Sequence, residues 1–150
     1  MSRSSTSIQA DDLVLLLGRL AIAALFLPSG FEKLLDYGAF EASLVAKGVP
    51  FATALAPLAV ATEAGGGLLL LLGVEIRWIS LLMIAFVFMA TATSHRFWDY
   101  QGAVRHAQSI NFFKNSAIIG GFLFLHVTGA GALSWDGWRR RSAAMTHRSA

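Results

Sequence analysis

The chain has 150 residues, of which 55% are hydrophobic and only 14% are charged. A soluble domain usually carries about 25% charged residues, so this deficit indicates a protein whose solvent is lipid. The chain contains no cysteine, which excludes disulfides, thiolate catalysis, cysteine-ligated metals and iron–sulfur clusters. The net charge is +3, and Arg139, Arg140, Arg141 and Arg148 crowd the C-terminal end. A basic tail that directly follows an apolar segment is typical of a topology signal rather than a nucleic-acid site.

Four apolar segments have about the length that a helix needs to cross a bilayer. We predict an all-α integral membrane protein, a four-helix antiparallel bundle with helices at about 13–31, 51–72, 76–94 and 112–131. Asp11 and Asp12 precede the first segment where a signal peptide has positive charge, so we predict a retained helix. Residues 1–10 are expected to form a disordered tail, residues 11–137 the membrane domain, and residues 138–150 a basic tail that is largely disordered.

An even number of spans places both termini on the same side of the membrane. Arginine and lysine residues outside the spans are slightly more numerous on that side, which favours cytoplasmic termini. Two loops, at roughly 32–50 and 95–111, then face outward. Trp98 and Tyr100 in the second loop suit the aromatic belt at a membrane interface.

Two charged residues, Arg19 and Glu63, lie inside the first and second spans, where an unpaired charge costs several kcal/mol. A rise of about 1.5 Å per residue puts Arg19 roughly 9 Å and Glu63 roughly 13 Å from the same end of the bundle. Small residues near Glu63, among them Ala56, Ala59 and Gly66, favour a close approach of the two helices. We therefore predict an intramembrane Arg19–Glu63 ion pair that fixes the helix register, with a role in chemistry as the alternative.

A second polar group is predicted at the outward ends of the helices. Ser29 and Lys33 lie one helical turn apart in the first span, and His95 closes the third span. The antiparallel arrangement brings these ends next to the start of the fourth span. The predicted ligand pocket therefore contains Ser29, Lys33, His95, Asn111, Lys114 and Asn115. Such a donor-rich, cationic pocket suits an anionic or carbonyl-bearing ligand, including a quinone head group; alternatively, the lysines reach lipid phosphates and His95 caps a helix.

Metal and haem sites are not predicted from this sequence. His95, His106, His126 and His147 show no close spacing, and no carboxylate is placed with them. A haem between His95 and His126 fails because the two residues are expected at opposite faces of the membrane. The sequence shows no flavin motif either and assigns no cofactor; quinone is a candidate because its carbonyl oxygens suit the cationic pocket.

Several motifs, taken in order and spacing, resemble those of the DoxX family. They are Leu17-Gly18-Arg19, Pro28-Ser29-Gly30-Phe31-Glu32-Lys33-Leu34, Glu63 before Gly65-Gly66, His95-Arg96-Phe97-Trp98, Phe113-Lys114-Asn115 before Gly120-Gly121, and residues 129–136, which read GAGALSWD. The resemblance runs from about Leu13 to Asp136. The closing motif departs from the family's pattern at Ala130 and Trp135, where proline and leucine are frequent.

The resemblance implies a small, four-helix protein of the bacterial inner membrane. The family takes its name from a subunit of a terminal quinol oxidase, and members are linked to oxidative-stress complexes and to gene clusters for metal or modified-peptide handling. The resemblance therefore implies a membrane subunit of a redox-linked complex. Electrons would come from a partner protein, because the chain has no metal or flavin motif of its own. The resemblance assigns no catalytic residue.

Two other functions fit the same sequence. A non-enzymatic adaptor would use the stripes of small residues to dock a helix of another protein or of a second copy. A small-molecule carrier built on Arg19 and Glu63 is the least favoured function, because the chain is short and contains no internal repeat. In each case the lipid bilayer is a partner and nucleic acid is not.

Overall fold

The computed structural model describes residues 9–146, and every regular element in this range is a helix. The helices are α1 (Ala10–Leu35), α2 (Tyr37–Ala46), α3 (Ala52–Leu72), α4 (Ile76–Ser94), α5 (Gly102–Thr128) and α6 (Trp135–Thr146), with a short 3-10 helix, η1, at Phe97–Asp99. Within the described range, four segments are long and apolar enough to cross a membrane: Ala10–Leu35, Ala52–Leu72, Ile76–Asp99 and Gly102–Thr128. The predicted all-helical class with four spans is therefore confirmed.

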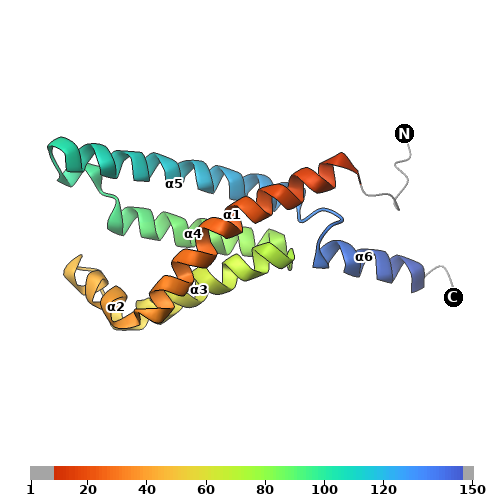
Figure 1. The fold of residues 1–150 in the computed structure, drawn as a ribbon, viewed down its shortest axis with the longest axis horizontal. Helices are drawn as coiled ribbons and strands as arrows, with labels where there is room; N and C mark the ends of the chain where they lie inside the picture. Colours follow the sequence, from red (N-terminus) through yellow and green to blue (C-terminus); the bar gives the residue numbers. More distant parts are fainter. Residues whose placement is uncertain (1–8, 147–150) are drawn as a thin grey trace.

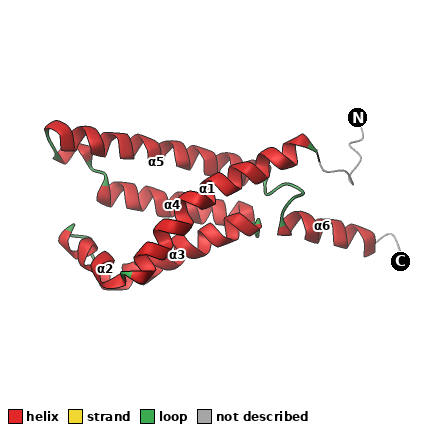
Figure 2. Cartoon of the chain, viewed as in Figure 1, coloured by secondary structure: helices red, strands yellow, loops and turns green. Residues whose placement is uncertain are grey.

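Helical structure extends beyond the predicted spans, so that loops are short throughout the described chain (Figure 2). Helix α2 occupies the first predicted loop, and α5 begins at Gly102 rather than near Phe112. Hydropathy misses the first turns of α5 because they are polar, although alanine, arginine and glutamine favour a helix. Most of the region predicted as a basic tail belongs to helix α6, whose arginine and alanine residues also favour a helix. The predicted disorder of residues 1–8 and 147–150 lies outside the described residues.

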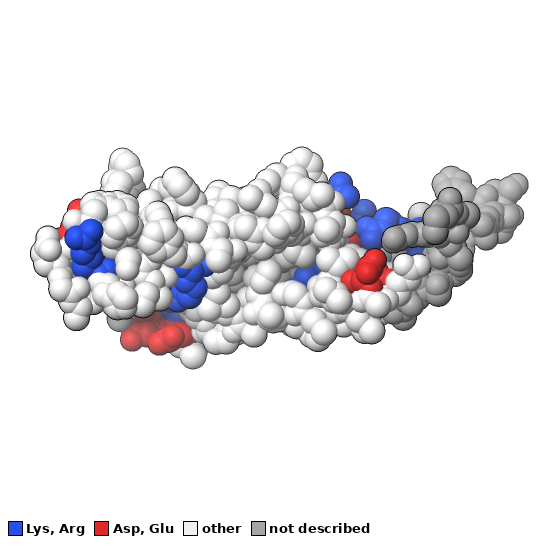
Figure 3. Space-filling model, turned by 90° about the horizontal axis from the view of Figure 1, so that it is seen from above, with Lys and Arg blue, Asp and Glu red and all other residues white. Residues whose placement is uncertain are grey.

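The spanning helices form two closely packed antiparallel pairs, α1 with α3 and α4 with α5, and α3 packs against α4 (Figure 1). Helix α1 begins, and α3 and α5 end, at the end of the molecule that carries α6, which we call the α6 end. Helix α2 and the turn between α4 and α5 lie at the opposite end, the α2 end. Charged side chains gather near the two ends and leave much of the middle uncharged (Figure 3). This distribution is expected of a bundle whose middle faces lipid.

The core between the pairs is apolar and aromatic. The ring of Phe26 lies 5.8 Å from that of Phe122 and 6.5 Å from that of Phe86, measured between centroids. Leu70, Met83 and other buried side chains of α3 and α4 pack against this cluster.

Helices α1 and α3 approach each other through glycine. A Cβ on Gly30 would lie 2.7 Å from the backbone nitrogen of Ala64, and one on Gly67 would lie 3.3 Å from that of Leu27. Backbone therefore meets backbone at both positions, as the small residues near Glu63 predict. The contact fixes how far one helix is shifted along the other.

Replacement of Gly30 by alanine tests this contact. The added methyl group meets backbone that cannot rotate away, so the helices must separate, and we expect a loss of about 1–3 kcal/mol of stability. Thermal unfolding in detergent measures the loss. Gly18→Ala is the matched control, because nothing lies within 4 Å of a Cβ at Gly18 in the same helix. A Gly30→Ala protein as stable as the Gly18→Ala protein would contradict the close approach.

Candidate functional site

A fully buried arginine closes the α6 end of the bundle. Nη1 of Arg19 donates hydrogen bonds to the carbonyl oxygens of Leu70, at 3.1 Å, and Leu71, at 3.2 Å, and Nη2 donates to that of Leu133. The last carbonyls of a helix have few partners within the helix, and the guanidinium bonds two of them at the end of α3. Gly73 ends this helix with φ 71°, and a Cβ there would collide with Arg19. We call Arg19 and its three carbonyl partners the Arg19 clamp.

The segment after α5 completes this closed end. The carboxylate of Asp136 accepts hydrogen bonds from the backbone nitrogens of Glu75, at 2.9 Å, and Ile76, at 3.1 Å, and so caps the start of α4. The carboxylate of Asp12 accepts from the backbone nitrogen of Ala132 at 2.6 Å. The GAGALSWD motif therefore joins α1, α3, α4 and α6, and its role here is structural.

The second buried charge, Glu63, pairs with a lysine. Nζ of Lys33 lies 2.5 Å from Oε2 of Glu63, and only 6% of the Glu63 side chain is exposed. Nζ of Lys33 also donates to Oγ of Ser29 at 3.0 Å and lies 5.5 Å from the ring centroid of Phe40. The lysine is thus held by a carboxylate, a hydroxyl and an aromatic face.

The Lys33–Glu63 pair replaces the predicted pair between Arg19 and Glu63. The prediction assumed that the first two spans begin and end at the same depth. In the structure, Gly30 lies against Ala64, so Glu63 is nearly level with the following turn of α1, which carries Lys33. Arg19 lies about four helical turns before Lys33 in α1 and reaches the end of α3 instead.

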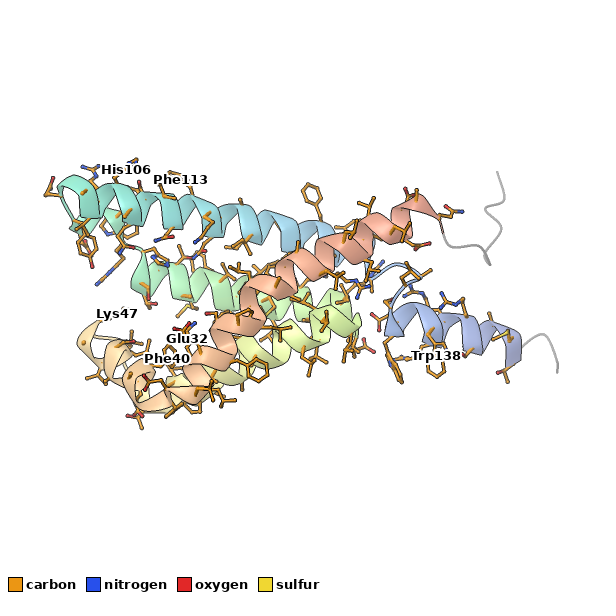
Figure 4. The ribbon with its side chains drawn as sticks, viewed as in Figure 1. Glu32, Phe40, Lys47, His106, Phe113 and Trp138 are labelled. Atoms are coloured by element: carbon orange, nitrogen blue, oxygen red, sulfur yellow. The ribbon has the colours of Figure 1, made fainter. Side chains whose placement is uncertain are left out.

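The Lys33–Glu63 pair lies in the wall of a cavity of about 560 Å³, formed by α1, α2, α3 and α4 at the α2 end. Most of its lining is apolar, including Leu44, Leu58 and Phe86, and the polar side chains are few. Phe40 of α2 and Lys47, which directly follows α2, also line it, and both are labelled in Figure 4. Nζ of Lys47 donates to Oγ of Ser94 at 3.2 Å and so connects α2 to the end of α4. We call this space the Lys33–Glu63 cavity.

The structure divides the six residues of the predicted pocket into two groups. Lys33 and His95 line the cavity, and Ser29, which is not part of the lining, accepts a hydrogen bond from Lys33. Nδ1 of His95 lies 2.8 Å from Oε1 of Gln108, which fixes the ring at the cavity rim.

The other three residues lie on α5, which contributes no side chain to the cavity lining. Nζ of Lys114 is exposed and donates to Oδ1 of Asn111 at 3.0 Å. Nδ2 of Asn115 donates to Oγ1 of Thr91 at 2.9 Å and joins α5 to α4. One side of helix α4 lines the cavity, and α5 packs against α4 without reaching the cavity. The sequence prediction therefore placed too many helix ends in one pocket.

The sequence analysis missed the contribution of α2. Phe40, Ser43 and Lys47 line the cavity, but the segment that carries them looks like a loop because it is too short to span a membrane. Asp36, which caps the start of α2, followed by alanine, glutamate and leucine, which favour a helix, is the signal that could have revealed it. Within residues 9–146, no three His, Asp or Glu side chains come together in a way that could hold a metal ion.

Comparison with known proteins agrees with this architecture. The DoxX family model matches residues 14–96, more than half of the chain. The chain belongs to the DoxX family. This DoxX protein is 32% identical over 127 residues to the inner membrane protein YphA of Escherichia coli strain K12. The alignment covers 85% of this chain and 91% of YphA. It is 32% identical over 126 residues to the inner membrane protein YqjF of the same strain, covering 84% and 92%.

No solved structure matches this DoxX protein. Its relatives and its four apolar helices make it a multi-pass protein of the inner membrane that contacts the lipid bilayer. The matched family range includes Arg19 of the Arg19 clamp and the two charged residues of the Lys33–Glu63 pair.

Replacement of Arg19 by methionine tests the structural role of the clamp. The change removes the guanidinium donor from the carbonyl oxygens at the end of α3 and in the loop after α5. We therefore expect a loss of about 1–3 kcal/mol in the free energy of unfolding. Thermal unfolding in detergent measures it, with Arg105→Met, an exposed arginine at the opposite end, as the control. If Arg19→Met unfolds at the wild-type temperature, the clamp does not hold the bundle together.

Proposed function

We propose that this DoxX protein is a membrane subunit of a redox-linked complex and binds the head group of a lipid-soluble quinone in the Lys33–Glu63 cavity. One observation carries the proposal: a nearly buried carboxylate and an ammonium group meet in the wall of an otherwise apolar cavity of about 560 Å³. Ligand sites are typically apolar spaces of about 300–1,000 Å³ with a few convergent polar groups.

The rim of the cavity supports entry from the bilayer. Leu58, Leu82 and Met89 line the cavity and are 63%, 48% and 57% exposed on spanning helices. Side chains exposed on such helices face lipid, so a ligand dissolved in the membrane reaches the cavity without crossing water. A quinone has the required chemistry, an apolar ring and tail with carbonyl oxygens at the head.

Lys33 supplies a donor to such a head group. Its ammonium has three N–H donors, and two of them bond Ser29 and Glu63 in the structure. The third is left for a quinone carbonyl oxygen, while Glu63 can hold or release a proton beside it. Reduction of a quinone to a quinol takes two electrons and two protons, and the electrons come from a redox partner protein.

We further propose that the α6 end faces the cytoplasm, so that the cavity lies in the outer half of the membrane. Arg77 and the arginines of α6 carry the positive charge of the α6 end. Positive charge is enriched in cytoplasmic segments.

A non-enzymatic adaptor is the second candidate function, and the exposed surface of helix α5 favours it. Only 11% of its most apolar window is buried, and Lys114 is exposed on this spanning helix. A charged side chain is costly against lipid, so a helix of another subunit covering this face would stabilise it. The quinone-binding experiment separates the two functions, because an adaptor needs no ligand in the cavity.

Replacement of Lys33 by methionine tests the proposed ligand site. Loss of a charge-assisted hydrogen bond, which contributes about 1.5–3 kcal/mol, is expected to weaken binding of a short-chain quinone by roughly tenfold or more. Equilibrium dialysis of the purified protein in lipid nanodiscs measures the dissociation constant. The double variant Lys33→Met, Glu63→Gln leaves no unpaired charge in the cavity wall and keeps the test valid if the single variant folds poorly.

Lys114→Met is the matched control, because it makes the same change on α5, away from the cavity. We expect it to bind quinone like the wild type. A wild-type protein that binds no quinone, or a Lys33→Met protein that binds it equally well, would contradict the proposal.

A further inference from the structure

A second pocket, of about 200 Å³, lies at the α6 end, between the start of α4, the turn after α5, and α6. Its charged lining consists of Glu75, Arg77, Asp136, Arg139 and Arg140. Three arginines face two carboxylates, which leaves the lining with one net positive charge. We call this space the Arg77–Arg140 pocket.

Both carboxylates of this pocket already have partners. Oε1 of Glu75 lies 2.7 Å from Nη1 of Arg139, and Asp136 accepts the backbone hydrogen bonds that cap α4. Neither Arg77 nor Arg140 forms an ion pair within residues 9–146. Nη2 of Arg77 donates to a carbonyl oxygen at 3.3 Å and that of Arg140 to another at 3.4 Å, both long bonds. Each guanidinium has five N–H donors, so most of them remain for a ligand.

The pocket borders an apolar surface that faces lipid. Trp78 lines the pocket and is 71% exposed, and Arg77 bonds the carbonyl of Val127, itself 72% exposed at the end of α5. Tryptophan at such a boundary is typical of the head-group level of a membrane. A ligand with an anionic group in the pocket would therefore have its apolar part beside α4 and α5.

We infer that the Arg77–Arg140 pocket binds the phosphodiester head group of an anionic phospholipid. Guanidinium groups match the oxygens of a phosphate with paired donors, and basic pockets between membrane helices bind such head groups. Inorganic phosphate shares the anionic chemistry but has no part that would use the apolar border. The bound lipid would tie α6 to the membrane surface and hold the start of α4 beside the end of α5.

Native mass spectrometry of the detergent-solubilised full chain tests this site with phosphatidylglycerol and phosphatidylcholine as probes. We expect the wild type to bind phosphatidylglycerol in preference to phosphatidylcholine. Arg77→Gln and, separately, Arg140→Gln should weaken phosphatidylglycerol binding by about fivefold, the factor that corresponds to one arginine near an anionic lipid. Arg140 is exposed on α6, so its replacement leaves the bundle fold intact.

Arg105→Gln, at the α2 end, is the control and should bind phosphatidylglycerol like the wild type. Equal binding of the two lipids by the wild type, or unchanged binding by both pocket variants, would overturn the inference. The last measurement is competition between inorganic phosphate and phosphatidylglycerol. If it displaces phosphatidylglycerol at equal concentration, and does so less well in the pocket variants, the ligand is free phosphate and the lipid assignment is wrong.

Discussion

The close contact of α1 with α3 is the constraint on which the rest of the structure depends. With no Cβ on Gly30, the backbones meet at Ala64, and this contact fixes the shift of one helix along the other. That shift decides which charges inside the membrane can meet. Glu63 comes level with Lys33, and Arg19 comes level with the end of α3. A different shift would leave buried charges without partners, at a cost of several kcal/mol.

The same shift gives the two ends of the bundle different properties. At the α6 end, Arg19 and Asp136 bond backbone groups of neighbouring helices and form a closed junction. At the α2 end, the helices diverge around a cavity with the Lys33–Glu63 pair in its wall. Both ends hold a buried charged side chain, but only the Lys33–Glu63 pair lies in the wall of a large, mostly apolar cavity. The closed end positions the helices, and the open end holds the cavity in which we propose that a ligand binds.

The sequence predicts the four spans because long apolar runs follow directly from the thickness of the bilayer. It also shows that charges inside these runs must be satisfied, and it correctly groups Lys33 with His95, which line one cavity. It does not yield the pairing, because a shift of about four helical turns between α1 and α3 changes no composition and depends on single contacts such as Gly30 with Ala64. Helix α2 is not predicted for another reason: its 10 residues are too few to span a membrane, and hydropathy does not distinguish such a short helix from a loop.

The measurement that tests this account most directly is a pair of double-mutant cycles for unfolding in detergent. One cycle combines Lys33→Met with Glu63→Gln, and the other combines Arg19→Met with Glu63→Gln. The account predicts a coupling free energy of roughly 1–3 kcal/mol in the first cycle and within about 0.5 kcal/mol of zero in the second, because residues without shared partners contribute additively. Strong coupling between Arg19 and Glu63, with none between Lys33 and Glu63, would contradict it.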